Sequence, residues 1–403
     1  MEAHMETPEP ASEAAEAAST AAAVLGDDDL LREILLRLGL PTSLVCAAAV
    51  SRRWLRCASD PAFLRRFRAR NLPLLLGVYV RTPDVQRLRF VPLARGPELA
   101  AVVRRGSFDL GEGAGSVWDC RNGRLLADVD GRNVVYSPLH PEQGTDILPE
   151  PPIPAEAYTL LFYFTDFLFY ENRDDRVSCT SVTVMCTERQ AWVYLSDLQA
   201  GVWGEGRYSG TIDIPVQGSL RVCEHHALLA NRKLYMMCLP HHIIGFDLPS
   251  MSSFCIELPD KVQYEYLESI GLSCAEGSGF FLIHMKGFQI SVWLHISDIT
   301  DSSSIGTWKL IDTICLQQVF HHFVELTWDS LPHVVRVAAV GENAEFVLLQ
   351  IQHKLFYMHI SSRAVEEVYE VSPAHGSLYG VYPFMTPWPP AFPALNGGAD
   401  HDQ

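Results

Sequence analysis

The stretch that decides the organisation of this chain is Asp27–Phe67, DDDLLREILLRLGLPTSLVCAAAVSRRWLRCASDPAFLRRF. Asp27 and the two aspartates after it can cap a first helix, because their side-chain oxygens accept hydrogen bonds from the free N–H groups of the first turn. Apolar residues then recur at helical spacing up to Leu38. Gly39 and Pro41 end this helix. The stretch therefore opens a small helical unit.

Two more helices are predicted in the same stretch. Thr42 or Ser43 can cap the second, which runs through LVCAAAVSRRWLRCA. Ser59 or Asp60 can cap the third, with Pro61 in the first turn, where its missing N–H costs little. The unit is thus expected to contain three short helices.

The apolar residues of this unit are too many for one small core. One set is expected to form the core: Leu31, Ile34, Leu38, Trp54 and Phe63. A second set is left over: Leu36, Leu40, Leu44, Val45 and Val50. A leftover apolar face indicates an interaction site. Either a helical partner or the rest of this chain could cover it, and periodicity alone favours neither.

The remainder of the chain has the pattern of an all-β protein. Short runs rich in Val, Ile, Phe, Tyr and Trp alternate with Gly, Pro, Asp and Asn, as in AWVYLS, GFFLIHM and KLFYMHIS. We expect a linker at residues 72–99 and a β domain at residues 100–386. Residues 1–24 are rich in Ala, Glu, Pro and Thr, and residues 387–403 are rich in Pro and Gly. Both ends are therefore predicted to be disordered.

An internal repeat suggests how the β domain is built. WVYLSDLQAGVW begins at Trp192 and WLHISDITDSSSIGTW begins at Trp293, an offset of 293 − 192 = 101 residues. Propeller blades of four strands recur every ~40–50 residues. The offset fits two blades, which predicts a propeller of six or seven blades. The repeated tryptophans, including Trp203 and Trp308, are then expected to pack blades rather than to form an aromatic ligand site.

Charge and cysteine content restrict the class of protein. The net charge of −17 argues against a general nucleic-acid or membrane-surface binder. The segment from Leu25 to Asn71 is nevertheless basic, with nine Arg against five acidic residues. Ten cysteines occur without a C-x-x-C pair, and the acidic N-terminus lacks the apolar core of a signal peptide. We expect reduced thiols and a location in the cytoplasm, the nucleus or both.

The helical stretch resembles an F-box, most closely those of grass F-box proteins, over residues 25–71. The matching positions are Leu30, Leu31, Glu33, Ile34, Leu35, Leu38, Leu44, Val50, Trp54 and Phe63. The usual Leu-Pro at the start of the motif is replaced near Gly26 and Asp27. The segment Trp118–Pro149 is similar to the opening blade of the propeller-like domains that accompany such F-boxes. The resemblance implies a multidomain α+β protein, a three-helix F-box followed by a propeller-like domain.

The resemblance also implies a function. An F-box docks on the Skp adaptor of a Skp–cullin–F-box ubiquitin ligase, and the β domain would bind an unidentified protein substrate. The residues implied in adaptor binding are Leu30, Leu31, Ile34, Leu35, Leu38, Leu44, Val50 and Trp54. We expect residues 25–71 to carry this contact separably from the β domain, with no role for nucleic acid or membrane.

Signatures of catalysis are missing from the sequence. The chain has no G-x-S-x-G nucleophile elbow and no G-K-[S/T] phosphate loop. The His225–His226, His241–His242 and His321–His322 pairs lack the spacing of zinc ligands. We therefore predict a non-catalytic adaptor without cofactor or metal. The alternative is a propeller-type ligand-binding or enzymatic protein with a helical appendage.

Overall fold

The computed structural model divides the chain into two compact units, a helical unit that includes residues up to Leu74 and from Met385 onward, and a β unit from Leu75 to Phe384. The predicted disorder of residues 1–24 lies outside the residues that the structure describes. Those residues are 26–71, 73–82, 88–93, 96–111, 113–159, 162–170, 178–214, 222–238, 241–262, 269–276, 279–296, 306–323, 335–372, 378–388, 390 and 392.

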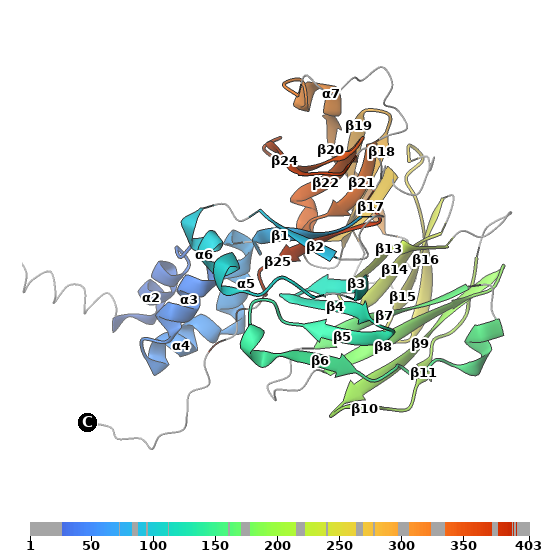
Figure 1. Ribbon diagram of the computed structural model, residues 1–403, viewed down its shortest axis with the longest axis horizontal. Helices are drawn as coiled ribbons and strands as arrows, with labels where there is room; N and C mark the ends of the chain where they lie inside the picture. Colours follow the sequence, from blue (N-terminus) through green and yellow to red (C-terminus); the bar gives the residue numbers. More distant parts are fainter. Residues whose placement is uncertain are drawn as a thin grey trace, which may run out of the picture. The chain divides into compact units, whose positions relative to one another are not determined.

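The N-terminal part of the helical unit contains four helices within residues 28–70 (Figure 1). They are α2 (Asp28–Leu35), α3 (Pro41–Ala48), α4 (Arg52–Ser59) and α5 (Pro61–Arg70). The predicted caps at Asp27 and Asp60 are confirmed. The Asp27 carboxylate accepts from the N–H of Asp29 at 2.8 Å, and the Asp60 carboxylate accepts from the N–H of Phe63 at 2.8 Å.

The predicted second helix is divided into α3 and α4. Ser51 is extended, with φ −161° and ψ 160°, and its hydroxyl accepts from the N–H of Trp54 at 3.2 Å. A serine in this conformation starts a helix rather than continuing one. The start of α3 also differs from the prediction, because Leu40 precedes it without a side-chain cap and Pro41 occupies its first turn.

The core of the helical unit combines the four helices with a residue from the far end of the chain. Its buried apolar residues include Leu31, Leu44 and Phe67, and they pack together with Trp388. The prediction that residues 387–403 are a disordered tail is therefore wrong at Trp388, which is only 9% exposed. Two aromatic rings make this contact, because the indole of Trp388 stacks on Phe67.

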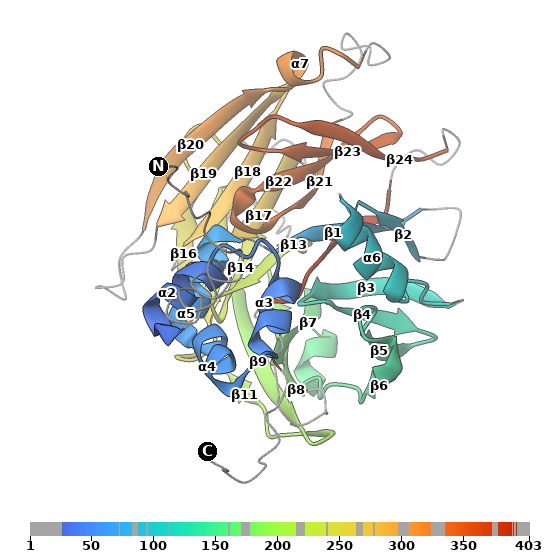
Figure 2. The same cartoon turned by 90° about the vertical axis from the view of Figure 1, so that its left-hand side faces the viewer.

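The described residues of the β unit form six antiparallel sheets, which we number as blades 1 to 6 (Figures 1 and 2). Blade 1 contains β25 (Gly380–Met385), β1 (Leu75–Arg81) and β2 (Leu88–Pro92). Blade 2 contains β3 (Ala114–Arg121), β4 (Arg124–Val129), β5 (Arg132–Tyr136) and β6 (Thr145–Leu148). Blade 3 contains β7 (Phe162–Tyr170), β8 (Ser178–Cys186), β9 (Gln190–Gln199) and β10 (Val202–Trp203), with β11 (Arg207–Tyr208) and β12 (Ile212–Asp213) also paired to β9.

The second half of the β unit repeats a four-stranded meander. Blade 4 contains β13 (Val222–Ala230), β14 (Lys233–Cys238), β15 (His242–Asp247) and β16 (Ser252–Glu257). Blade 5 contains β17 (Ile270–Cys274), β18 (Phe280–Lys286), β19 (Gln289–Ile296) and β20 (Thr307–Cys315). Blade 6 contains β21 (Val335–Val340), β22 (Phe346–Ile351), β23 (Lys354–His359) and β24 (Val365–Glu370). The short helices of the unit are α6 (Pro97–Arg105), α7 (Leu316–Val319), η1 (Pro141–Gln143), η2 (Ala155–Thr159) and η5 (Glu342–Ala344).

The six sheets make a six-bladed β-propeller. The first strands of successive blades, such as β13, β17 and β21, lie next to one another. Blade 1 joins the two ends of the unit, because β1 and β25 are neighbours in the same sheet. The N–H of Tyr379 donates to the carbonyl of Arg81 at 2.9 Å beside this pairing. Closure by strands from both ends removes the free edges that an open sheet would expose.

The predicted linker at residues 72–99 is wrong. This segment contains β1 and β2 and the start of α6, so the propeller begins at Leu75 instead of residue 100. The sequence pattern missed it because the partner of β1 is β25, which lies at the other end of the chain. A strand with so distant a partner has no local repeat to mark it.

The predicted two-blade offset of the tryptophan repeat is confirmed. Trp192 lies in β9 and Trp293 in β19, which are the third strands of blades 3 and 5. The tryptophans that follow each of them have equivalent contacts. The indole N–H of Trp203 donates to the carbonyl of Pro149 at 3.1 Å, and that of Trp308 donates to the carbonyl of Glu257 at 2.7 Å. Each acceptor lies at the end of the preceding blade, so these side chains join adjacent blades.

Candidate functional site

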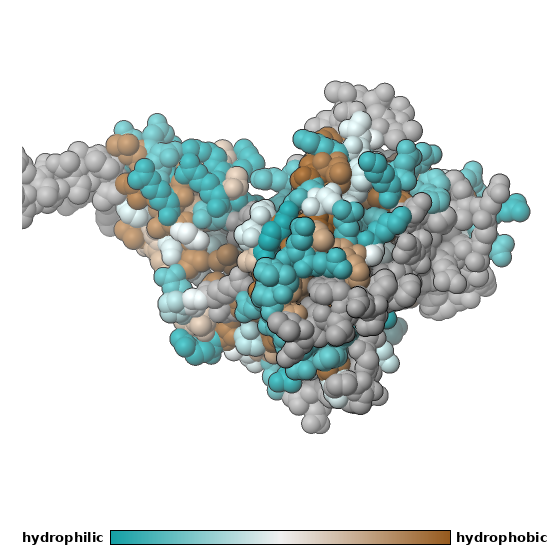
Figure 3. All heavy atoms as spheres, turned by 90° about the horizontal axis from the view of Figure 1, so that it is seen from above, coloured by the Kyte–Doolittle hydropathy of each residue, from teal (hydrophilic) through white to brown (hydrophobic). Residues whose placement is uncertain are grey.

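The helical unit exposes three large apolar side chains among the eight predicted adaptor-binding residues. Leu30 is 47% exposed, Ile34 is 36% exposed and Val50 is 66% exposed. Leu30 and Ile34 are four residues apart on α2, so they lie on the same side of that helix. Figure 3 shows hydrophobic residues among hydrophilic ones on the surface of this unit. These three residues can contact a partner without any rearrangement of the unit.

Three other predicted contact residues are core residues instead. Leu31 and Leu44 are 0% exposed, and Leu35 is 1% exposed. They pack against one another and cannot touch a partner while the unit stays folded. The predicted division of the apolar residues is also wrong in part, since Ile34 was expected in the core, and Leu36 and Leu44 on the surplus face.

The last two predicted residues, Leu38 and Trp54, lie at the margin of the core. Both are half-buried and pack against the buried cluster of the helical unit. Each leaves part of its side chain accessible. Leu38 and Trp54 can therefore pack on the core and also contact a partner, although neither is as exposed as Val50.

Ion pairs at the surface of the helical unit connect its helices. The Arg53 guanidinium lies 2.6 Å from the Asp28 carboxylate, and that of Arg66 lies 2.5 Å from Glu33. The hydrogen bond from Arg53 lowers the pKa of Asp28, and that from Arg66 lowers the pKa of Glu33. The second pair joins α5 to α2, the helix that carries Leu30 and Ile34. Other arginines of the unit are exposed and have no ion pair among the described residues: Arg37, Arg56, Arg65 and Arg70.

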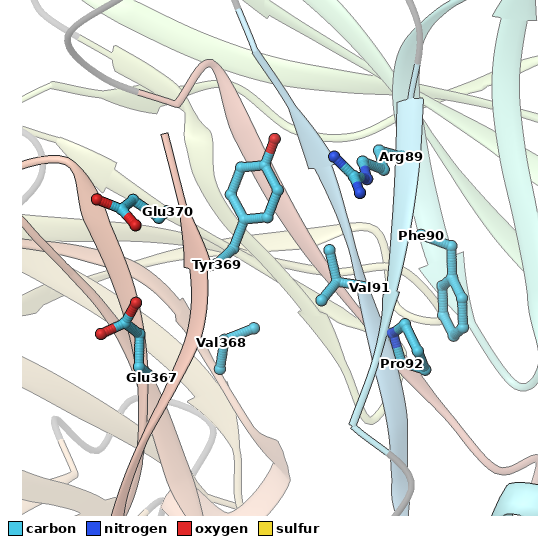
Figure 4. Close-up of a pocket in the computed structure, with 8 residues that line it drawn as sticks. All are labelled: Arg89, Phe90, Val91, Pro92, Glu367, Val368, Tyr369 and Glu370. Atoms are coloured by element: carbon cyan, nitrogen blue, oxygen red, sulfur yellow. The ribbon is translucent and has the colours of Figure 1, made fainter. Parts of the chain in front are cut away.

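The β unit has a shallow groove of about 410 Å³ between β2 of blade 1 and β24 of blade 6. Arg89 and Tyr369 point toward each other across it, with the guanidinium 5.6 Å from the ring centre (Figure 4). Two acids line the groove and both are already paired, Glu367 with Lys354 and Glu370 with His353. The lining of the groove thus combines charged side chains with apolar ones such as Val91 and Val368.

The metal candidates do not form a site within the described residues. No group of three or more His, Cys, Asp or Glu side chains there could hold a metal ion. His321 and His322 are exposed. The side chains of His225 and His226 lie outside the described residues. None of the nine described cysteines forms a disulfide. None of the described helices is both long and apolar enough to span a membrane.

Two family models match the chain, and together they cover most of it. The model described as F-box-like matches residues 28–70, the segment that forms α2 to α5. The model described as F-box protein AT5G49610-like, beta-propeller, matches residues 116–392. The chain belongs to this family of plant F-box proteins. We call the four helices and Trp388 the F-box unit, and the β unit the propeller.

The comparison with curated proteins found no match. Among solved structures, the extracellular domain of the putative one component system BT4673 from B. thetaiotaomicron is 13% identical with a TM-score of 0.32, covering 66% of this chain and 30% of that chain. Hsv2p from Kluyveromyces lactis is 10% identical with a TM-score of 0.31, covering 60% and 72%. YCF48 from Cyanidioschyzon merolae is 7% identical with a TM-score of 0.34, covering 66% and 88%. This chain spans less than a third of the length of the BT4673 structure. The low TM-scores support no argument about function.

Sequence reasoning missed Trp388 as a residue of the F-box unit. The signal was present in the tail, where PWPPAFP places two large aromatic residues in an otherwise Pro- and Gly-rich segment. A segment that remains disordered has few aromatic residues. Trp388 and Phe392 therefore indicated a segment that packs on something.

Proposed function

We propose that this F-box protein is the substrate-recognition subunit of a Skp–cullin–F-box ubiquitin ligase. The observation that carries the proposal is the exposed apolar set of Leu30, Ile34 and Val50 on a helical unit that the F-box-like model matches. In this proposal the F-box unit binds the Skp adaptor, which connects it to the cullin scaffold, and the propeller binds a protein substrate.

The energetics of such an interface favour these three residues. Full burial of a Leu, Ile or Val side chain contributes roughly 1.5–3 kcal/mol. A few buried residues carry most of the binding free energy of a typical interface. Leu30 and Ile34 are exposed apolar residues on one side of α2, in a unit that is otherwise rich in Arg, and this favours a protein partner over free solvent.

The adaptor role requires binding and positioning, with no chemistry at the F-box protein itself. Both acids of the propeller groove have a basic neighbour, Lys354 beside Glu367 and His353 beside Glu370. We propose that the protein works without a cofactor or a metal and in the cytoplasm, the nucleus or both. The exposed faces of the propeller supply the area that a protein substrate needs.

Replacement of Ile34 by Asp in the full chain tests the proposal. A charge in the interface must be desolvated without a partner, so we expect adaptor affinity to fall at least tenfold. Ile147→Asp is the matched control, because Ile147 is 59% exposed on β6 of the propeller. Binding is measured by titration calorimetry with purified Skp adaptor, and circular dichroism checks that both variants fold. Equal affinity of the folded Ile34→Asp variant and the wild type would contradict the proposal.

A further inference from the structure

The C-terminal segment of this chain forms part of the F-box unit. Trp388 is 9% exposed, Pro390 is buried and Phe392 is half-buried. Trp388 belongs to the buried cluster of the F-box helices, and Phe392 packs against that cluster. We call these three residues the C-terminal clamp. Trp388 and Phe392 lie more than three hundred residues beyond the helices on which they pack.

The clamp makes specific contacts with α5. The indole of Trp388 stacks on the ring of Phe67, with ring centroids 5.8 Å apart and an angle of 4° between the planes. The guanidinium of Arg68 lies 6.0 Å from the same indole. Phe67 in turn packs on Phe63, with centroids 6.1 Å apart. Offset aromatic pairs and cation–π contacts each add to the free energy gained by burial of the rings.

Two hydrogen bonds join the residue Thr386, just before the clamp, to the end of the helical segment. The N–H of Leu74 donates to the hydroxyl of Thr386, and the N–H of Thr386 donates to the carbonyl of Leu74, both at 2.9 Å. Leu74 immediately precedes β1, and Thr386 immediately follows β25. The clamp therefore follows closely after β25, the strand that pairs with β1 in blade 1.

We propose that Trp388 is a positioning residue for adaptor binding, so that an F-box without the clamp is not a competent binding module. Trp388 fixes α5 through Phe67. The Arg66–Glu33 ion pair links α5 to α2, and α2 presents Leu30 and Ile34 to the adaptor. If the clamp is lost, only a fraction of the molecules holds α2 in place, and the apparent affinity falls by that fraction. The part of this proposal that concerns adaptor binding rests on the proposed function.

The test compares Trp388→Ala, Trp388→Phe and wild type as full chains. Tyr379→Ala is the matched control, because Tyr379 is an aromatic residue of the propeller that is 66% exposed. Hydrogen exchange should rise at least tenfold in α5 and α2 of Trp388→Ala, with no change in blades 3 to 5. Adaptor affinity should fall at least tenfold in the same variant. Trp388→Phe should retain most of the exchange protection and most of the adaptor affinity, because a ring still covers Phe67.

A truncation adds a second readout that a general loss of stability would not give. A chain that ends at Pro387 keeps β25 but lacks the clamp. Added in trans, a synthetic peptide of residues 385–396 should restore exchange protection and adaptor binding, and the same peptide with Ala in place of Trp388 should not. Unchanged exchange in Trp388→Ala overturns the proposal, as does unchanged adaptor affinity in that variant. If the wild type itself failed to bind adaptor, the proposed function would be wrong, while the exchange data would still decide whether the clamp completes the F-box unit.

Discussion

The F-box unit and the propeller bury their hydrophobic residues in different ways. Blades 3 and 4 share a buried cluster of side chains that neighbouring parts of the sequence supply, such as Val184 of blade 3 and Met236 of blade 4. The F-box unit instead uses Trp388 from the far end of the chain and leaves Leu30, Ile34 and Val50 exposed. A small unit buries a low fraction of its surface. The difference shows that the F-box helices are completed by a residue distant in the sequence, whereas the propeller blades other than blade 1 are built from consecutive strands.

The largest expected effect comes from the core of the F-box unit. Leu44→Ala should destabilise this unit by about 2–5 kcal/mol, because Leu44 is 0% exposed and its truncation leaves a cavity. Val50→Ala, two-thirds exposed on the same unit, should change its stability by less than about 0.5 kcal/mol. Hydrogen exchange of α2 to α5 in mild denaturant measures the change in stability of the two variants. Similar losses in the two variants would contradict the division into buried and exposed residues.

The sequence predicted features of the F-box unit that depend on local chemistry. Asp27 and Asp60 were correctly placed as helix caps, since a cap acts within one turn. The sides of α2 were harder to assign. Leu30 and Ile34 share one side and Leu31 and Leu35 another, as the helical period requires. Periodicity cannot say which side faces inward, and Ile34 and Leu44 were assigned incorrectly for that reason.

In the propeller, too, the sequence predicted features that lie close together in the chain and missed contacts between distant residues. The repeat that begins at Trp192 and Trp293 identified two equivalent blades, because both copies lie within one stretch of the chain. Blade 1 and the clamp were missed because their contacts join residues about three hundred positions apart, as in the pairing of Leu74 with Thr386. Contacts of this kind leave no periodic signal in the sequence. The adaptor and the substrate stay predictions for a related reason, since the surface of one chain does not identify its partners.

Acidification should affect the propeller through His295. This residue is 2% exposed and lies between Phe280 and Trp308, with ring centroids 5.0 and 4.9 Å away. Burial lowers the pKa of His295 to about 4 from the ordinary value of 6.5. His295 is therefore protonated at a lower pH in the folded state than in the unfolded state. Stability is fully present above pH 6.5 and is lost as pH falls from 6.5 through about 4, by on the order of 2–4 kcal/mol.

His295→Phe should remove this part of the pH dependence, because the aromatic packing remains and the titrating group is gone. Thermal unfolding of the propeller between pH 7 and pH 4 measures the effect. His321→Phe is the control, since His321 is exposed beyond α7. An equally steep pH dependence in His295→Phe and wild type would show that other groups cause the loss.

A smaller effect is expected at Gly279 in blade 5. A Cβ atom at this position would lie 2.3 Å from the carbonyl oxygen of His295, which belongs to the neighbouring strand and cannot move without its sheet. Gly279→Ala should destabilise the propeller by about 1–3 kcal/mol. Gly210→Ala is the control, because a Cβ atom added there would meet no described atom within 4 Å. Hydrogen exchange should change in blade 5 and not in α2 to α5, and a matching change in the F-box unit would show that the two units unfold together.

The smallest expected effect concerns the charge of the F-box unit. Arg65 is exposed on α5 and has no ion pair among the described residues, within a segment whose nine Arg exceed its five acids. If the adaptor presents an acidic surface, Arg65→Glu should slow association a few-fold at low salt and leave dissociation nearly unchanged, since a charge at the rim acts mainly on encounter. The difference should shrink as salt is raised, because the Debye length falls from about 10 Å at 0.1 M to about 3 Å at 1 M. Arg132→Glu, exposed in the propeller, is the control of equal charge change. Stopped-flow association rates that do not depend on salt, or an equal slowing in Arg132→Glu, would show that the basic face of the F-box unit does not guide the encounter.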